Sequence, residues 1–376
     1  MSLTGRQLNR TTLDRQMLLR RDSTEVIDAV RRIVALQAQE AASPYLALWN
    51  RIVGFDPADL DAAFSNRAVV KSPLIRLTLH AVHAEDWPAF HAAMSPSLRA
   101  SRLFDNRFRS TGLSTADADH LLVDLATFLT CPRSDGEVEQ MLETRLSERQ
   151  PRLWWALRRF APLIHAPTGG PWSFDAPSYV TAGTTLDPDA WEEATQRLVL
   201  RYLEGFGPAS ASDVAQFTML RRPVVAMALA GLAGDVAELA GPRGETLFDV
   251  VGAPLADEDT AAPPRLLPMW DSILLAYADR GRVIPPAYRR LVIRRNGDVL
   301  PTLLVDGYVA GVWRRVEAGI EATAFHRLDD PAWAGLAAEA SGLVTLLADR
   351  EPAVYHRYAH WWSTDMPGAE VRILPG

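Results

Sequence analysis

The chain has 376 residues, of which 48% are apolar and 23% charged, and its formal net charge is −7. This length is too great for one ordinary core and predicts two to four packed modules. No apolar run approaches a membrane span, the N-terminus lacks the apolar segment of a signal peptide, and Cys131 is the only cysteine. A disulfide framework and a thiolate metal cluster are therefore excluded, and we expect a cytoplasmic protein that contacts no membrane.

The charge balance also bears on nucleic-acid binding. A net negative chain does not suit a nonspecific nucleic-acid coat protein, for which a basic domain is expected. DNA binding stays possible, because a local patch sets the electrostatic field at a binding face. Lys71 is the only lysine among 39 basic residues, so arginine, which suits bidentate phosphate contacts, carries almost all of the positive charge.

The first module is predicted to be a winged helix over residues 1–92. Apolar periodicity and turn-forming prolines predict helices that cover residues 6–21 and 22–34 and that start near residues 44 and 57. Residues 68–80 contain two β-rich runs around Ser72-Pro73, which predict a hairpin. Helices followed by a hairpin are the order of a winged helix.

The same order is predicted twice more along the chain. We assign residues 93–183 to a second winged helix, in which Ser134 and Glu137 have the spacing of a capping box. Residues 184–262 are assigned to a third winged helix and a linker, with a helix capped by Asp187. Residues 263–376 are strand-rich and form a C-terminal β-domain in this interpretation. The expected fold class is α+β, with tandem winged helices in a C shape.

A short motif, Leu36-Gln37-Ala38-Gln39, follows the second predicted helix. In an α-helix, residues two apart point to nearly opposite sides, whereas in an extended segment they share a side. If both amides serve one site, the chain must leave helical geometry at Leu36 or Gln37. For an arbitrary pair of glutamines, the ordinary interpretation is that they are surface amides in a loop.

Several segments give the chain a wider resemblance. The passage from Leu36 to Trp49 resembles the start of the AlkZ/YcaQ family of bacterial DNA glycosylases, with glutamines at both catalytic positions. The resemblance continues in Arg76-Leu77-Thr78-Leu79-His80, Gly205-Phe206-Gly207-Pro208-Ala209, Leu266-Leu267-Pro268-Met269-Trp270-Asp271, Arg280, Asp306-Gly307 and Gly311-Val312-Trp313-Arg314. It implies tandem winged helices closed by a β-domain. The double-glutamine branch, which includes an azinomycin self-resistance enzyme, is associated with the unhooking of interstrand crosslinks.

The resemblance and the chemistry of amides together give a hypothesis for Gln37 and Gln39. An amide cannot accept a full proton, so either residue would be a poor general base. Both can orient one water toward C1′ of a nucleotide, and orientation suffices when the leaving group is already good. A purine alkylated at N7 or N3 is cationic and departs neutral. We therefore expect a monofunctional glycosylase that acts as a monomer on double-stranded DNA with alkylated or crosslinked purines.

Other residues are assigned around this motif. Arg76, Thr78 and His80 alternate with apolar residues, so they are expected on the polar side of a strand. Residues expected to bind DNA are Lys71, Arg76, Arg294, Arg295 and Asn296, and the candidates for the border of the site are His80 and Asp271. A structural hydrogen-bonding role suits Asp271 at least as well. Arg294 and Arg295 precede an Asn296-Gly297 turn of predicted type I′, within a hairpin over 291–305. Glu40 is expected to be solvated.

The sequence implies no metal and no organic cofactor, because it has no zinc motif, P-loop or dinucleotide-binding glycine pattern. Two other function classes suit the same modules. A noncatalytic tandem winged-helix regulator would also bind DNA, and a scaffold would bind protein through its winged helices.

Overall fold

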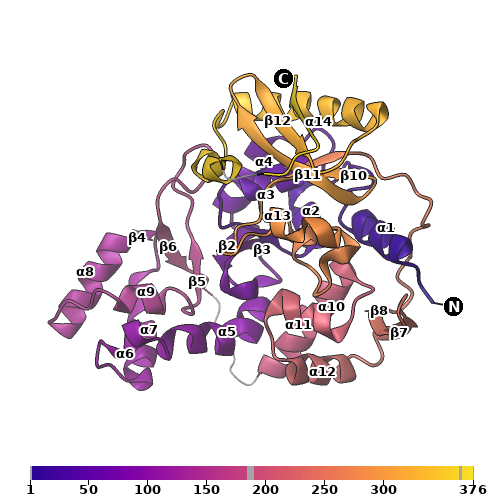
Figure 1. Ribbon diagram of the computed structural model, residues 1–376. Coiled ribbons are helices and arrows are strands. Elements are labelled where there is room, and N and C mark those ends of the chain that lie inside the picture. The colour runs from indigo at the N-terminus through magenta and orange to yellow at the C-terminus, as the bar shows by residue number, and fades with distance from the viewer. Residues whose placement is uncertain (1, 184–189, 364–365, 376) are drawn as a thin grey trace.

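A computed structural model describes residues 2–183, 190–363 and 366–375 (Figure 1). The fold is α+β, as predicted. The winged-helix order of helix, strand, two helices and hairpin first occurs in α2 (Val26–Ile33), β1 (Leu36–Gln37), α3 (Ser43–Trp49), α4 (Pro57–Ser65), β2 (Val69–Pro73) and β3 (Leu79–His83). At α4, Asp56 accepts a hydrogen bond from the Ala58 N–H at 2.8 Å and thereby caps the helix.

The order recurs in α7 (Thr115–Phe128), β4 (Arg133–Ser134), α8 (Asp135–Leu146), α9 (Leu153–Leu157), β5 (Leu163–His165) and β6 (Ser178–Thr181). The predicted capping box of Ser134 and Glu137 is confirmed. Strands of both copies form one six-stranded sheet in the order β1-β3-β2-β5-β6-β4. The connecting helices are α5 (Trp87–Leu103) and α6 (Asn106–Arg109). Because α5 runs through residue 92, the predicted boundary falls inside a helix, and the division into modules stays a prediction.

A third copy contains α10 (Trp191–Phe206), α11 (Ala211–Thr218), α12 (Arg222–Gly231), β7 (Val236–Ala240) and β8 (Thr246–Val250). Ala209 forms an isolated bridge with Phe248 and so takes the place of the short first strand. The cap predicted at Asp187 lies outside the described residues.

The C-terminal part is built on a five-stranded sheet in the order β13-β12-β11-β10-β9. Its strands are β9 (Arg265–Leu267), β10 (Thr302–Val305), β11 (Tyr308–Val316), β12 (Gly319–Ala324) and β13 (Glu370–Leu374). The helix α14 (Asp330–Ala348) meets the length and composition of a membrane span. Its fully buried residues nevertheless recur at intervals of three and four, the pattern of a helix that packs one face on a sheet, and they include Leu336, Ala340, Leu343 and Leu347.

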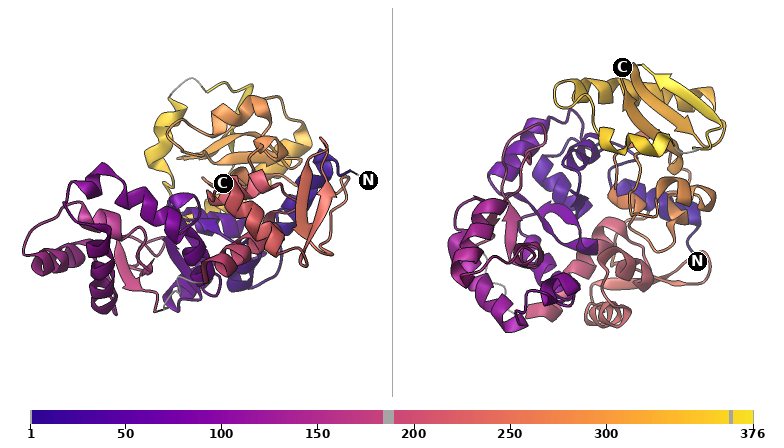
Figure 2. Two further views of the ribbon diagram at one scale, coloured as in Figure 1. Left: turned by 90° about the horizontal axis from the view of Figure 1, so that it is seen from below. Right: turned by 60° about the vertical axis from the view of Figure 1, so that its left-hand side comes forward.

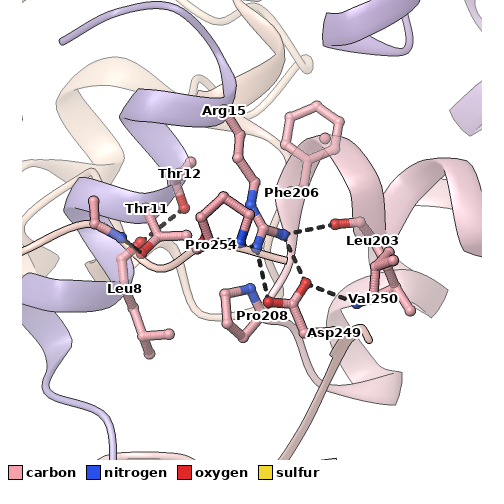
Figure 3. Close-up of polar contacts among 12 residues, drawn as sticks. Leu8, Thr11, Thr12, Arg15, Leu203, Phe206, Pro208, Asp249, Val250 and Pro254 are labelled. Atoms are coloured by element: carbon pink, nitrogen blue, oxygen red, sulfur yellow. Dashed lines mark hydrogen bonds and ion pairs between the residues drawn. The ribbon is translucent and has the colours of Figure 1, made fainter. Parts of the chain in front are cut away.

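The N-terminal helix α1 (Gly5–Arg15) joins the third copy to the C-terminal domain, rather than packing only within the first module. Arg15 makes a bidentate ion pair with Asp249 of β8, at 2.7 and 2.8 Å, and donates to the carbonyl of Leu203 at 3.0 Å (Figure 3). Asn9 donates to the carbonyl of Gly307 at 2.8 Å. The Arg15–Asp249 pair is buried, and the additional hydrogen bond to Leu203 offsets part of its desolvation.

These contacts give the chain a curved arrangement. Figure 1 shows β2 and β3 near the centre, with the second copy to one side, α10–α12 below and the C-terminal sheet above. The right-hand view of Figure 2 shows the same parts following a curve.

Candidate active site

The chain is extended at Leu36 and Gln37, which form β1, and it bends at Gln39 and Glu40. The site shared by the two glutamines stays a prediction. Helix α2 ends at Ile33, and Val34 has a positive φ of 74°, which turns the chain out of the helix. The backbone N–H of Ala38 then donates to the carbonyl of Leu79 at 2.8 Å. The contact with β3 therefore extends to Ala38, directly before the bend.

Close packing by the third copy holds this turn in place. A Cβ atom added to Gly205 would lie 2.5 Å from the Val34 side chain, so only glycine lets α10 approach the end of α2 so closely. Ser272 donates to the carbonyl of Ala35 at 2.7 Å from the other side. The matched segments around Gly205 and Asp271 thus support the glutamine motif from behind.

The two glutamines differ in their surroundings. Gln37 is 5% exposed, and its side-chain oxygen accepts the backbone N–H of Gln39 at 3.1 Å. Gln39 is exposed. Because an amide oxygen has two acceptor sites, Gln37 keeps one for a further donor such as a water.

The β2–β3 hairpin exists, but the predicted turn at Ser72-Pro73 is wrong. Pro73 still pairs with Leu79, and the chain reverses at residues 74–78 through the 3₁₀ turn η1 (Ile75–Leu77). Arg76 and Leu77 have positive φ values of 52° and 58°. Consequently the predicted alternation of polar and apolar faces fails at the tip, although His80 lies directly opposite Gln37 in the β1–β3 ladder.

His80 is buried and held as a neutral ring. Its Nδ1 lies 3.1 Å from the carbonyl of Thr78, and its Nε2 lies 3.4 Å from Nη2 of Arg76. The Thr78 carbonyl can only accept a hydrogen bond and the Arg76 guanidinium can only donate one. We therefore assign the ring proton to Nδ1 and leave Nε2 as the acceptor. Burial, together with the positive charge of Arg76, lowers the pKa of His80 to about 3. His80 therefore borders Gln37 as expected, but it is a poor general base.

Lys71 is buried, whereas a contact with a DNA phosphate requires an exposed ammonium group. It pairs with Ala81 and His165, one residue out of phase with the Gln37–His80 row, so its side chain leaves the opposite face of the sheet. Lys71 is 6% exposed, and its ammonium lies 4.2 Å from the centre of the Phe174 ring. Burial lowers its pKa to about 8. In this arrangement the ammonium contacts an aromatic ring, and DNA binding by Lys71 stays a prediction.

Asp271 has a structural partner that sequence spacing could not reveal. Its two oxygens accept from Arg51 at 2.8 and 2.9 Å, and both side chains are buried. One oxygen also accepts the Ile273 N–H at 3.2 Å and caps η3 (Ser272–Leu274). These contacts favour the structural role that the sequence left open for Asp271, and its place at the border of the site stays a prediction.

The Asn296-Gly297 turn is present, whereas the long hairpin predicted around it is not. Helix α13 (Arg289–Val292) precedes the turn, and a single bridge joins Ile293 to Val299. Gly297 has a positive φ of 92°, but Asn296 does not, so the predicted type I′ turn is also wrong.

The residues of this turn have unequal access to solvent. Arg295 and Asn296 are exposed, whereas Arg294 is half-buried with its guanidinium 5.0 Å from the centre of the Trp361 ring. The indole of Trp270 donates to the Gly297 carbonyl at 3.0 Å. The indole of Trp361 donates to Asp298 at 2.9 Å, and these two contacts fix the turn to its surroundings.

Glu40 belongs to a network that the sequence did not indicate, so the expectation that it is solvated is wrong. It pairs with Arg357 and accepts the Tyr358 hydroxyl at 2.8 Å. Both partners lie in η6 (His356–Trp362), and the Tyr358 ring meets the Trp270 ring edge-on at 5.5 Å. The aromatic residues of the segment His356–Trp362 were the sequence feature that could have indicated this network. The network links the glutamine motif, through Trp270, to the exposed turn at Arg295.

Comparison with known proteins connects this geometry to a family. The model of the family described as "DNA glycosylase AlkZ-like" matches residues 30–346, which contain the glutamine motif, the β2–β3 tip and the 294–298 turn. The chain belongs to the AlkZ-like family of DNA glycosylases. It is therefore an enzyme of the class that hydrolyses N-glycosidic bonds, and the resemblance seen in the sequence is confirmed.

Two comparisons cover most of the chain. An interstrand DNA cross-link repair glycosylase of Streptomyces sahachiroi is 26% identical over 352 residues, which span 86% of this chain and 91% of that protein. The solved structure of Streptomyces sahachiroi DNA glycosylase AlkZ matches with a TM-score of 0.80 at 21% identity, over 93% of this chain and 98% of that chain. The likeness in structure supports the fold of this AlkZ-like protein.

Proposed function

We propose that the protein is a monofunctional DNA glycosylase that releases cationic N7- or N3-alkylated purines and unhooks interstrand crosslinks in double-stranded DNA. The observation that carries the proposal is the contact between the two glutamines at the end of β1, where buried Gln37 accepts the Gln39 N–H and Gln39 is exposed. The relative named as a cross-link repair glycosylase supports the same substrate class. The noncatalytic alternatives do not account for membership of a glycosylase family.

The chemistry follows from what two neutral amides can do. Departure of an N7-alkylated purine breaks the C1′–N9 bond, and its electron pair neutralises the cationic base without an acid. One water, hydrogen-bonded to the free acceptor site of Gln37 and to Gln39, adds its oxygen to C1′. Its proton passes to solvent, because neither amide can keep it. Normal bases leave as anions and are not released by this arrangement.

The groove contact is proposed to come from the turn at Arg295 and Asn296. Both side chains are exposed, and the turn is joined to the glutamine motif through Trp270, Tyr358 and Glu40. Arginine is favoured in a narrow minor groove by the negative potential there. A base tethered to the opposite strand cannot be turned fully into a closed pocket, so crosslinks require an open site.

The deciding experiment is incubation with a duplex that carries one 7-methylguanine and a matched duplex that carries a nitrogen-mustard-type crosslink. We expect free modified base, an abasic site and no strand cleavage in the first, and separated strands in the second. The Gln37→Ala/Gln39→Ala double variant is the control for contaminating activity. Tight binding without base release by the wild-type protein would favour the regulator.

A further inference from the structure

Arg76 lies close to the glutamine motif, and among the described residues neither Arg76 nor Arg280 forms an ion pair with a carboxylate. Arg76 contacts His80, which lies directly opposite Gln37. In the described ranges no acid pairs with Arg76, and its Nη1 atom is buried without a hydrogen-bond partner. Buried polar atoms are usually satisfied, so an orphaned guanidinium nitrogen points to a ligand.

Helix α11 joins Arg280 to the same region, because its Phe217 contacts the Arg76 guanidinium and its Asp213 accepts the Ala278 N–H, two residues before Arg280. Arg280 lies in η4 (Arg280–Arg282), donates to the carbonyl of Tyr277, and its buried Nε has no partner among the described residues. Its charge lowers the pKa of Arg76, after the larger effect of burial, and the charge of Arg289 acts on Arg280 in the same way. Asp213 attracts Arg280 only from a distance, because its own oxygens cap α11 at Ser210 and accept the Ala278 N–H.

The tip that presents Arg76 is rigid rather than a loose loop. Arg76 and Leu77 are consecutive non-glycine residues in the left-handed region, which costs free energy and persists only where the surroundings enforce it. Arg159 donates to the Leu77 carbonyl at 2.9 Å. The Arg76 guanidinium lies 5.1 Å from the centre of the Phe217 ring of α11, which fixes its position from the other side.

This charge is unfavourable for glycosidic cleavage unless it is neutralised. The transition state places positive charge on the sugar, and the glutamines carry no negative charge to face it. Arg76 would repel that charge. A phosphate of the DNA backbone resolves both problems, because it satisfies the guanidinium nitrogens and is itself negative.

We propose that Arg76 and Arg280 bind a backbone phosphate beside the lesion, and that this phosphate supplies the negative charge that faces the oxocarbenium-like sugar. The proposal rests on the glycosylase function given above. Arg76 and Arg280 are then positioning residues, and the electrostatic stabilisation comes from the substrate. The phosphate is not consumed, and no bond to it forms or breaks.

The test uses duplexes with one 7-methylguanine and a single neutral methylphosphonate, moved in turn through the two phosphates on each side of the lesion. Excision is measured in single turnovers at saturating enzyme, and binding is measured in parallel. For the wild-type protein we expect one position at which the rate constant falls about tenfold or more, the size of a charge-assisted hydrogen bond. A fall in affinity alone, or no sensitive position, would overturn the proposal.

The variant Arg76→Gln links the effect to the protein. We expect it to be about tenfold slower on ordinary DNA and to lose no further rate at the sensitive position. Arg280→Gln should behave similarly, and it replaces Arg76→Gln as the test if that variant does not fold. Arg372→Gln, which removes an exposed arginine of β13, is the matched control and should keep the full wild-type sensitivity. An equal methylphosphonate penalty in wild type and in the two variants would contradict the assignment.

The two proposals can fail separately. If the wild-type protein releases no base from DNA with ordinary phosphates, the glycosylase proposal fails and the transition-state role falls with it. The binding arm still reports whether Arg76 holds a phosphate, because the affinity loss at one position should disappear in Arg76→Gln.

Discussion

Gln37 holds the backbone of Gln39: its side-chain oxygen accepts the Gln39 N–H at 3.1 Å, while Gln39 itself stays exposed. One glutamine is therefore a fixed part of the sheet edge, and the other depends on it for position. The Gln37 amide has an internal hydrogen bond in addition to the proposed contact with water, whereas Gln39 has only the latter. Mutation of the two residues should therefore affect protein stability differently.

Gln37→Ala and Gln39→Ala should each slow excision of 7-methylguanine by about a hundredfold, the usual cost of losing one preorganised polar contact in a site. The double variant should lose less than the product of the two effects, because both amides hold one water. Single-turnover rates at saturating enzyme measure this. Only Gln37→Ala should also lower thermal stability, since it alone removes an internal hydrogen bond. Full activity in the double variant would disprove the water-positioning role.

Excision of cationic bases should change little between about pH 6 and 9, because amides do not titrate there. His80 stays neutral over this range, since burial and Arg76 lower its pKa to about 3. Asp271 is held by Arg51 in a buried ion pair. A bell-shaped profile in single-turnover rates would show that a titrating base has been missed.

Stability, unlike activity, should depend on pH through buried His80 and His91 and half-buried His165. Burial lowers the pKa values of His80 and His165 to about 3 and that of His91 to about 4. The unfolded chain binds protons at these sites near pH 6.5, whereas the folded chain does not, so stability is full above pH 6.5 and falls as pH decreases toward 4. Thermal melts at pH 7.5 and 5 measure the loss. His165→Phe should make that loss smaller, and an unchanged slope would contradict the assignment.

The end of α2 before the glutamine motif could be predicted, because two side chains that share a site at a spacing of two cannot lie on a continuous helix. The chain does leave the helix and forms β1 at Leu36 and Gln37, but the bend at Gln39 could not be predicted from spacing. The hairpin tip could not be predicted, since Arg76 and Leu77 adopt positive φ without a glycine to signal it. Likewise, Arg51 lies 220 residues from Asp271 and Glu40 lies 318 from Tyr358, and sequence spacing carries no information about such pairs.

The Arg51–Asp271 pair gives a further test of structural against catalytic roles. Asp271→Asn leaves the buried Arg51 charge without its partner and should cost about 3–5 kcal/mol of unfolding free energy. Urea unfolding measures this. An apolar replacement of both residues, Arg51→Met with Asp271→Leu, should recover much of the stability together with excision. Loss of excision in a stable double variant would instead indicate that Asp271 has a role in the active site.

The turn at residues 294–298 should contact DNA through Arg295 rather than Arg294. Arg294 is half-buried, stacks over Trp361, and burial lowers its pKa, so Arg294→Ala should chiefly reduce stability. Arg295 is exposed, so Arg295→Ala should weaken binding and reduce the slope of log affinity against log salt by about one. Binding titrations at several salt concentrations measure both.

Deletion of Asn296 and Gly297 tests whether the same turn acts as a groove probe. The crosslinked base is restrained by its partner strand and depends most on a part that enters the duplex, so crosslink unhooking should fall at least as much as excision of 7-methylguanine. The deletion also removes the Gly297 carbonyl that Trp270 contacts, so the folded state must be checked by its melting curve. Full crosslink unhooking by a folded deletion variant would show that the turn does not enter the DNA groove. The hairpins of the winged helices would then be the candidates for this contact.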